Sequence, residues 1–242
     1  MNKDTSIIRI EFMRGEEIKF ISHLDIMRTF GRAIRRAKIP IAYSQGFNPQ
    51  PVIVFGLPLS VGVTSLTEYA DIELTEAISP LELKYTLNKE LPAGLKILDA
   101  AIKQDGKNIM ALIYMASYEI FVYTTNDLVN NEIENNEIEN KVRKFVRKDT
   151  IIARKEGKKG TRDIDIKPMI FDLEIKSINT IDNNSNRHIY KLTTMLRAGG
   201  EANLKPDLLI EAINEHMNLN LKLARIHRTG LYINKDGILV KP

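Results

Sequence analysis

Four arginines in the segment 23–37 are the residues of this chain best suited to bind an anion. They recur at intervals of four, three and one, so a helix would carry them on one side: Arg28, Arg32, Arg35 and Arg36. A guanidinium group binds phosphate through paired hydrogen bonds, and Arg in place of Lys at all four positions favours an anionic partner. A solvated helix face without a ligand is the alternative.

A second basic stretch lies between Ala153 and Lys167 and reads ARKEGKKGTRDIDIK. Two glycines, Gly157 and Gly160, divide its cations, of which we take four as candidate binding residues: Lys155, Lys158, Lys159 and Arg162. No Ser or Thr follows a Gly-Lys pair before a helix, so the spacing is not that of a phosphate loop. A basic hairpin that contacts nucleic acid or a protein is one interpretation, and a solvated turn is the other.

His23 stands at the start of a helical pattern and two residues before Asp25. A carboxylate that orients a histidine can make it a general base, which would suit a nuclease or a transferase. Residues two apart on a helix do not face each other, however. A histidine that is hydrogen-bonded near the helix start is therefore the favoured interpretation, and we take His23 as a binding residue and assign no catalytic residue.

Metal and cofactor chemistry finds little support in the composition. The chain has no cysteine, which excludes disulfides, thiolate catalysis and cysteine-ligated zinc or iron–sulfur clusters. The other histidines, His188, His216 and His227, show neither HxxxH nor HExxH spacing. We therefore predict no metal site and no cofactor.

The stretch from Tyr43 to Leu74 places six glycines and prolines between apolar runs, which constrains the backbone and is typical of a shaped surface. Its polar beginning could recognise a ligand through hydrogen bonds, and we take as candidates Tyr43, Ser44, Gln45, Gly46, Phe47, Asn48 and Gln50. In the alternative interpretation, Tyr43 packs against the fold and Asn48 supports a turn before Pro49.

The strand-like end of the same stretch carries a second polar group. Residues two apart in a strand share a face, so Tyr69, Asp71 and Glu73 would line one side. Their polarity predicts an exposed face, with catalysis by the two carboxylates as a minor alternative.

Apolar periodicity and turn signals predict the elements that position these residues. A strand at residues 7–13 precedes a helix that begins after Ser22, has Asp25 as its capping partner and ends before Pro40. The elements that follow give the order β-α-β-β-α-β over residues 1–107, and the same order is assigned to residues 108–242. We therefore predict an α+β protein of two tandem ferredoxin-like units with antiparallel sheets, the second unit containing the basic hairpin.

The overall composition is that of an ordinary globular protein. The 242 residues are 43% hydrophobic and carry a formal net charge of +4, which permits nucleic-acid binding without requiring it. No apolar run approaches the roughly 20 residues that cross a bilayer, and the N-terminus lacks a signal-peptide pattern. We therefore expect a cytoplasmic location and no membrane partner.

One long segment, from Lys19 to Leu74, closely resembles the signature of a bacterial family called radical SAM-linked or radical SAM-associated protein. It reads KFISHLDIMRTFGRAIRRAKIPIAYSQGFNPQPVIVFGLPLSVGVTSLTEYADIEL, and the resemblance continues more thinly through the basic hairpin and DIDIKPMI. The family is a domain of unknown function, encoded beside or fused behind a cobalamin-binding radical SAM protein, often near genes of ribosome and RNA metabolism. The resemblance therefore implies a radical SAM protein as partner. This chain cannot be that enzyme, whose cluster needs three thiolates.

The chain departs from the family pattern at two positions. Family members usually carry histidine between the two prolines, where this chain has Gln50, and often serine where it has Val54. Any acid, base or ligand role of that histidine is lost here, which favours recognition by shape or hydrogen bonds over catalysis in the loop.

Taken together, these features favour a non-catalytic accessory or substrate-binding protein that acts with a radical SAM enzyme. The Gly/Pro loop and the first helix would form a docking surface, while the arginines and the hairpin would hold an anionic substrate, with RNA as the favoured candidate. Two alternatives stay open: an enzyme of RNA processing or modification that uses His23, and a purely structural interaction module.

Overall fold

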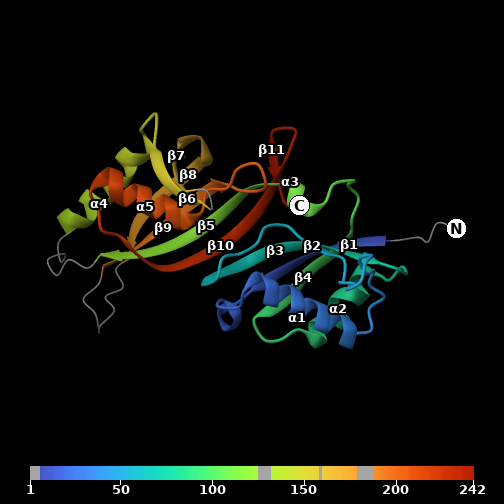
Figure 1. Ribbon diagram of the computed structural model, residues 1–242. Helices are drawn as coiled ribbons and strands as arrows, with labels where there is room; N and C mark the ends of the chain where they lie inside the picture. The colour runs from blue at the N-terminus through green and yellow to red at the C-terminus, as the bar shows by residue number, and fades with distance from the viewer. Residues whose placement is uncertain (1–5, 125–131, 158–159, 179–187) are drawn as a thin grey trace. The chain divides into compact units, whose positions relative to one another are not determined.

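The computed structural model describes residues 6–124, 132–157, 160–178 and 188–242, and its elements confirm an α+β protein (Figure 1). The described residues form five α-helices, a large β-sheet and a separate two-stranded sheet. The chain divides into two compact units, residues 1–114 with 228–242, and residues 115–227. Strands β5 (Ile113–Thr124) and β10 (Lys222–Lys235) contribute residues to both units. Among the described residues, no helix combines the length and the apolar character that crossing a membrane requires.

The first unit follows the predicted order β-α-β-β-α-β. Its elements are β1 (Ser6–Arg14), α1 (His23–Arg36), β2 (Ile53–Phe55), β3 (Val63–Leu74), α2 (Pro80–Glu90) and β4 (Leu95–Ile102). Strand β1 pairs antiparallel with β3 and β4, and the short β2 pairs antiparallel with β3. The unit also contains a 3-10 helix (Glu16–Ile18), α3 (Ile109–Leu112) and β11 (Ile238–Val240), which pairs with the end of β10.

Helices α1 and α2 cover one face of strands β1, β3 and β4 (Figure 1). The predicted cap of α1 is confirmed: Ser22 Oγ accepts from the Asp25 N–H at 3.2 Å and donates to Asp25 Oδ2 at 2.7 Å. The apolar stripe of α1 and alternate residues of β1 meet in the core: Ile26, Phe30, Ala33, Ile34, Ile8, Ile10 and Phe12. Because side chains alternate along a strand, Arg9 and Glu11 point to the opposite face of the sheet.

The second unit differs from the predicted repeat. Its elements are β5, α4 (Glu132–Val146), β6 (Ile152–Gly157), β7 (Gly160–Asp165), β8 (Ile170–Ile178), β9 (His188–Arg197), α5 (Pro206–Met217) and the beginning of β10. Strand β9 pairs antiparallel with β5 and β8, whereas β6 and β7 form the separate hairpin. Strands β7 and β8 are separated by the 3-10 helix Lys167–Met169, where Pro168 has no N–H to continue a strand.

Residues 228–242 belong to the first unit, although the sequence analysis assigned them to the second domain. Arg228 supplies the physical reason: its Nη1 lies 2.9 Å from both carboxylate oxygens of Glu68 in β3, and both side chains are buried. In such a pair, each buried charge compensates the other. The two residues are 160 positions apart, so no local pattern indicates their contact.

Candidate functional site

A loop from Tyr43 to Gln50 begins and ends beside β3. At its base, the Ala42 N–H donates to the Glu73 carbonyl at 2.8 Å, and the Glu73 N–H donates to the Val52 carbonyl at 3.2 Å. Tyr43 and Pro51 face each other as an antiparallel bridge. The two ends of the loop are therefore tied to each other and to the strand.

Short-range hydrogen bonds hold the interior of the loop. The Ser44 N–H donates to the Gln50 carbonyl at 2.8 Å, and the Gln50 N–H donates to Ser44 Oγ at 3.0 Å. Gln50 Nε2 donates to Asn48 Oδ1 at 3.2 Å. Gly46 has a φ of 128°, a backbone angle that residues with a Cβ rarely adopt. Asn48 thus supports the turn, as the alternative interpretation held, and Gln50 helps to close the loop.

The aromatic side chains of this loop are exposed to solvent. All residues from Tyr43 to Gln50 are exposed; Tyr43 is 44% exposed and Phe47 is completely exposed. A large apolar side chain gains nothing from such a position unless a ligand or partner covers it. The loop is therefore exposed along its whole length and is not buried in the fold.

The loop also lies against helix α1. A Cβ built on Gly31, in the middle of α1, would lie 3.5 Å from Pro51 Cγ, so the glycine allows the base of the loop to approach the helix. We call the loop–helix surface the exposed residues of the loop and of the helix that it contacts: Tyr43 to Gln50, and from α1 Leu24, Met27, Arg28, Arg32 and Arg35.

Two of the four arginines of α1 have carboxylate partners. Arg28 Nη1 lies 3.0 Å from Asp25 Oδ1, one turn earlier in the helix. Arg36 Nε lies 2.8 Å from Glu90 Oε2, and Arg36 also donates to the Glu90 carbonyl. Arg36 is therefore committed to the contact between α1 and α2, while the pair of Arg28 is exposed and worth little.

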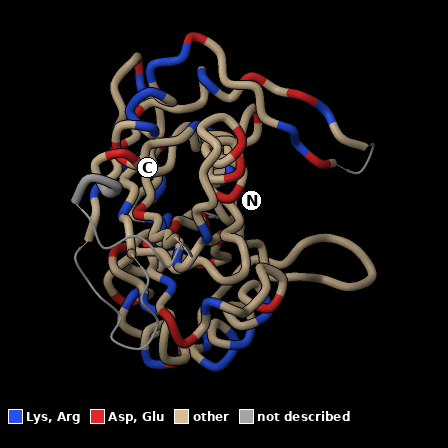
Figure 2. Tube along the Cα trace, turned by 90° about the vertical axis from the view of Figure 1, so that its left-hand side faces the viewer, with Lys and Arg blue, Asp and Glu red and all other residues tan. Residues whose placement is uncertain are grey.

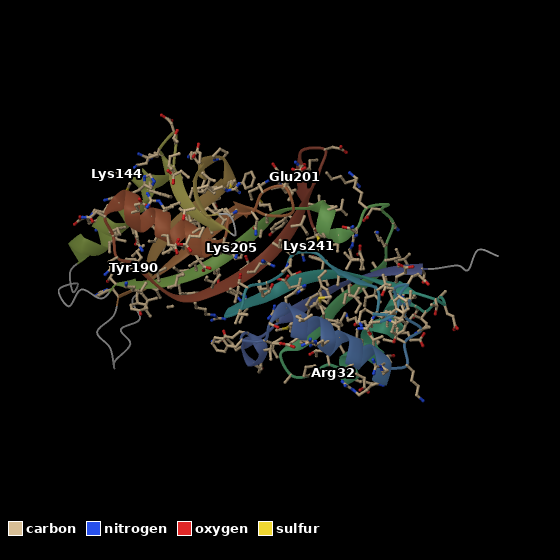
Figure 3. The ribbon with its side chains drawn as sticks, viewed as in Figure 1. Arg32, Lys144, Tyr190, Glu201, Lys205 and Lys241 are labelled. Atoms are coloured by element: carbon tan, nitrogen blue, oxygen red, sulfur yellow. The ribbon has the colours of Figure 1, made fainter. Side chains whose placement is uncertain are left out.

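The other two arginines, Arg32 and Arg35, form no ion pair with any described residue. Figure 3 shows Arg32 projecting from α1 away from the strands. In Figure 2, lysine and arginine positions gather at the lower end of the view, where α1 and α2 lie. These two exposed guanidinium groups could form charge-assisted hydrogen bonds with an anion.

His23 is the first residue of α1 and is half-buried. Its ring meets that of Phe55 edge to face, with the ring centroids 5.3 Å apart. Burial lowers the pKa of His23, and the positive charge of Arg14 lowers it further. Asp25 binds Ser22 and Arg28 instead. The structure therefore does not form a His23–Asp25 pair, which agrees with the spacing argument against it.

Sequence reasoning missed a group of exposed apolar side chains near the start of α1: Phe20, Leu24 and Val61. The Gly62 N–H donates to the Lys19 carbonyl at 2.7 Å, which brings the segment before α1 beside the loop after β2. The residue that commonly packs onto a helix is the one just before its cap, here Ile21, and nothing local indicated that Phe20 would be exposed.

Sequence reasoning also missed a buried arginine behind His23. Arg14 is buried, its Nη2 donates to the Ile21 carbonyl at 3.0 Å, and its Nε has no hydrogen-bond partner among the described residues. Burial lowers the pKa of Arg14, while the negative charge of Glu68 acts in the opposite direction. The pattern IIRIEFMR reads only as a strand, so nothing local indicated this buried charge.

The prediction of an exposed polar face at Tyr69, Asp71 and Glu73 is wrong. Tyr69 and Asp71 are buried and Glu73 is partly buried. Arg9 Nε donates to Asp71 Oδ1 at 2.7 Å, and Lys103 Nζ lies 3.6 Å from Asp71 Oδ2. The prediction failed because the cationic partners come from other elements, and polarity alone does not distinguish a solvated face from a buried ion pair.

The basic stretch of the second unit is a β-hairpin with one exposed ion pair and with two cations that face each other. Lys155 and Arg162 face each other across β6 and β7, and Arg154 Nε lies 3.8 Å from Asp163 Oδ1. The other two candidates, Lys158 and Lys159, lie outside the described residues. A cavity of about 540 Å³ lies between β6 and α5, and its walls carry both cations and carboxylates: Arg154, Lys155, Lys205, Asp207, Glu211 and Glu215. The described part of the hairpin is thus not a purely basic surface.

Comparison with known proteins identifies a family and only distant structural similarities. The model of a family described as "uncharacterized protein conserved in bacteria (DUF2344)" matches residues 8–206. No curated protein matches the chain. A structure of a Cbf5-Nop10-Gar1 complex is similar with 12% identity and a TM-score of 0.47, over 93% of this chain and 48% of that chain, so this chain spans about half of that protein. An unknown protein from Galdieria sulphuraria is similar with 10% identity and a TM-score of 0.27, over 91% and 98% of the two chains. These similarities are too weak to carry an argument about function.

Proposed function

The chain belongs to the DUF2344 family of uncharacterized bacterial proteins, and we propose that it is a non-catalytic accessory protein that holds RNA for a radical SAM enzyme. The loop–helix surface binds the RNA, with aromatic rings against bases and α1 arginines against phosphates. The partner enzyme performs the chemistry.

The observation that carries this proposal is the completely exposed Phe47 on a loop that hydrogen bonds hold in shape. Stacking of a base on an aromatic ring contributes about 1–3 kcal/mol and is tolerant of sequence, because every base has a π-face. Arg32 and Arg35, on the helix against which the loop lies, supply charge-assisted hydrogen bonds to phosphate. Single-stranded RNA suits such a surface because its bases are free to leave the stack.

The radical SAM partner is supported by the resemblance of residues 19–74 and by the absence of cysteine. The exposed apolar side chains near the start of α1 offer a contact that a protein partner would cover: Phe20, Leu24 and Val61. We also propose a ferredoxin-like architecture for the first unit, supported by its element order and by antiparallel pairing in the order β4-β1-β3-β2.

The test is electrophoretic binding of the purified protein to single-stranded RNA at two salt concentrations. Each phosphate contact lowers the slope of log affinity against log salt by about 0.7 for a single strand. We expect binding that weakens steeply with salt, and a shallower slope for the double variant Arg32→Gln/Arg35→Gln. No binding at low salt would remove the RNA part of the proposal.

Arg36→Gln is the matched control for each single variant, Arg32→Gln and Arg35→Gln. It removes the same charge from the same helix, but at a guanidinium already engaged by Glu90, so its salt slope should stay close to that of the parent protein. The same loss from the control and from the single variants would mean that total charge, and not the loop–helix surface, governs binding.

The exposed apolar side chains also favour a second candidate, a purely structural module for the radical SAM partner. Co-purification of the two proteins after nuclease treatment, with no RNA bound by either the single chain or the complex, would support this candidate. Loss of the complex in Phe20→Ala, with RNA binding retained, would support the leading proposal and place the two contacts on different residues.

A further inference from the structure

A polar cavity of about 350 Å³ lies on the sheet face of the first unit that α1 and α2 do not cover. Its walls come from β1, β3, β4 and the segment after β4, and they include Arg9, Glu11, Tyr69, Asp99, Lys103 and Asp105. This cavity plays no part in the RNA proposal, and the inference below does not depend on that proposal.

Strand register sets the arrangement of the cavity wall. Glu11 of β1 lies directly opposite Tyr69 of β3 on one side and Asp99 of β4 on the other. Residues opposite each other in adjacent strands point to the same face, so these three side chains form a row across three strands. Two carboxylates, Glu11 and Asp99, are thus direct neighbours, and like charges in such a pair are unfavourable unless a cation lies between them.

The cations already in the cavity are committed elsewhere. Arg9 donates to Asp71 Oδ1 and to Asp105 Oδ2, both at 2.7 Å. Lys103 lies 3.6 Å from Asp71 and 4.0 Å from Asp105. The charges of these two cations and two carboxylates neutralise one another. The negative charges of Glu11 and Asp99 must therefore be compensated by other groups.

The described residues compensate the negative charge of only one of these two carboxylates. Glu11 Oε1 accepts from Thr67 Oγ1 at 2.8 Å, and Lys241 Nζ lies 3.6 Å from it. Asp99 accepts from the backbone N–H of Ala100 and forms no ion pair with any residue of the described ranges. One carboxylate of the row therefore lacks a cation.

Tyr69 supplies an independent observation at the other end of the row. The side chain is buried and lines the cavity, yet its hydroxyl has no hydrogen bond of ordinary geometry in the part of the chain that the structure describes, although Thr67 and Glu11 lie near it. Leaving a buried hydroxyl without a partner is unfavourable, and a ligand that completes it is one explanation for such a group. A ligand here would meet a hydrogen-bond donor at Tyr69 and an acceptor at Asp99.

We propose that this cavity binds a small primary amine that also carries a hydroxyl or another hydrogen-bond acceptor. The ammonium group lies between Glu11 and Asp99, and the acceptor receives the Tyr69 hydroxyl. An organic cation fits better than a metal ion, since the carboxylates stand in a row across strands and the described residues contain no group of three or more potential metal ligands. Lys241, labelled in Figure 3, shows that an ammonium group reaches Glu11, and its exposed side chain is free to be displaced.

The test is an NMR titration of the full chain with ethanolamine and, separately, with propylamine, in which a methyl group replaces the hydroxyl. We expect shifts at residues 9–11, 69 and 99–105 for both amines, with ethanolamine bound more tightly. Asp99→Asn should weaken both amines by about twofold to fivefold, since the ion pair of an exposed carboxylate is weak. Tyr69→Phe should weaken ethanolamine alone, by about fivefold to tenfold. Choline, which has no N–H donor, is the control and should bind more weakly than ethanolamine.

Folding of the variants does not limit the test. Asp99 is exposed, and Tyr69→Phe removes only a hydroxyl without a partner, so its melting temperature should equal or exceed that of the parent. Lys241→Gln adds a further readout: removal of the competing ammonium should tighten amine binding. Shifts spread over the whole surface, equal binding of both amines with no response to Tyr69→Phe, or an unchanged affinity in Asp99→Asn would each overturn the proposal.

Discussion

The loop–helix surface and the polar cavity belong to the same unit and use the same residue types, yet they treat charge differently. On α1, Arg35 is exposed and forms no ion pair with a described residue. In the cavity, Arg9 is buried and meets Asp71 and Asp105, each at 2.7 Å. Between these two arginines, burial distinguishes the one that is available to a ligand from the one that is committed to the fold.

The two regions should therefore respond differently to substitution. Removing one partner of a buried ion pair leaves the other charge uncompensated, which costs several kcal/mol. Removing an exposed side chain changes the free energy of unfolding little, typically within about 0.5 kcal/mol. Stability measurements should separate the cavity from the loop–helix surface before any ligand is added.

The largest expected effect is that of Asp71→Ala. The carboxylate accepts from Arg9 and from the Ile109 N–H at 3.0 Å, and Lys103 lies close to it. We expect a loss of about 3–5 kcal/mol in the free energy of unfolding, because two buried cations lose their shared partner. Urea denaturation followed by circular dichroism measures this loss.

Asp105→Ala is the matched control. Asp105 is the other partner of Arg9, but its side chain is 39% exposed. An ion pair with this much solvent contact contributes about 1 kcal/mol or less. Equal losses in the two variants would contradict the view that burial separates these carboxylates.

A smaller effect, in the stabilising direction, is expected for Gly31→Ala in α1. Glycine inside a helix costs about 0.5–1 kcal/mol relative to alanine. The new Cβ would lie 3.5 Å from Pro51 Cγ, an ordinary contact, so the loop need not move. Urea denaturation should show a gain of that size. Gly31→Leu, by contrast, would push the loop from the helix and should lose both the gain and RNA affinity.

A still smaller effect concerns the pH dependence of stability at His23, whose side chain is half-buried. Burial and Arg14 lower the pKa of His23 from its usual 6.5. A group with a lowered folded pKa contributes stability above its unfolded pKa and loses it as the pH falls through the folded value. The stability of the parent should therefore fall more than that of His23→Gln when the pH decreases from above 6.5 to below it. Parallel curves for the two proteins would show that burial does not perturb this histidine.

The sequence predicts the first unit well because its signals are local. Ser22 and Asp25 mark the start of α1, and Phe30 and Ile34 reach the core as their spacing indicates, although Leu24 and Met27 at the same spacing are exposed. Exposure of the Gly/Pro loop also follows from its turn residues. Gln50, by contrast, could be recognised only as a departure from a family histidine, and its contact with Asn48 needed coordinates.

The remaining features depend on contacts between distant residues. The pair of Arg228 with Glu68 joins positions 160 apart and brings residues 228–242 into the first unit. Asp71 reads as an exposed strand residue until Arg9 and Lys103 are placed beside it. No helical or strand period encodes such pairings, and so sequence reasoning located the loop–helix surface but missed the polar cavity.

The smallest expected effect on stability, and the sharpest test of the comparison, is that of Phe47→Ala. Because Phe47 is completely exposed, its removal should change the free energy of unfolding by no more than about 0.5 kcal/mol. If the ring stacks on a base, RNA affinity should fall by about 1–3 kcal/mol. Phe171→Ala, at a half-exposed aromatic residue in β8 of the second unit, is the control and should leave RNA affinity unchanged. A Phe47 variant that binds RNA as well as the parent would leave the exposed ring without a role in binding, and the loop–helix surface would then rest on its arginines alone.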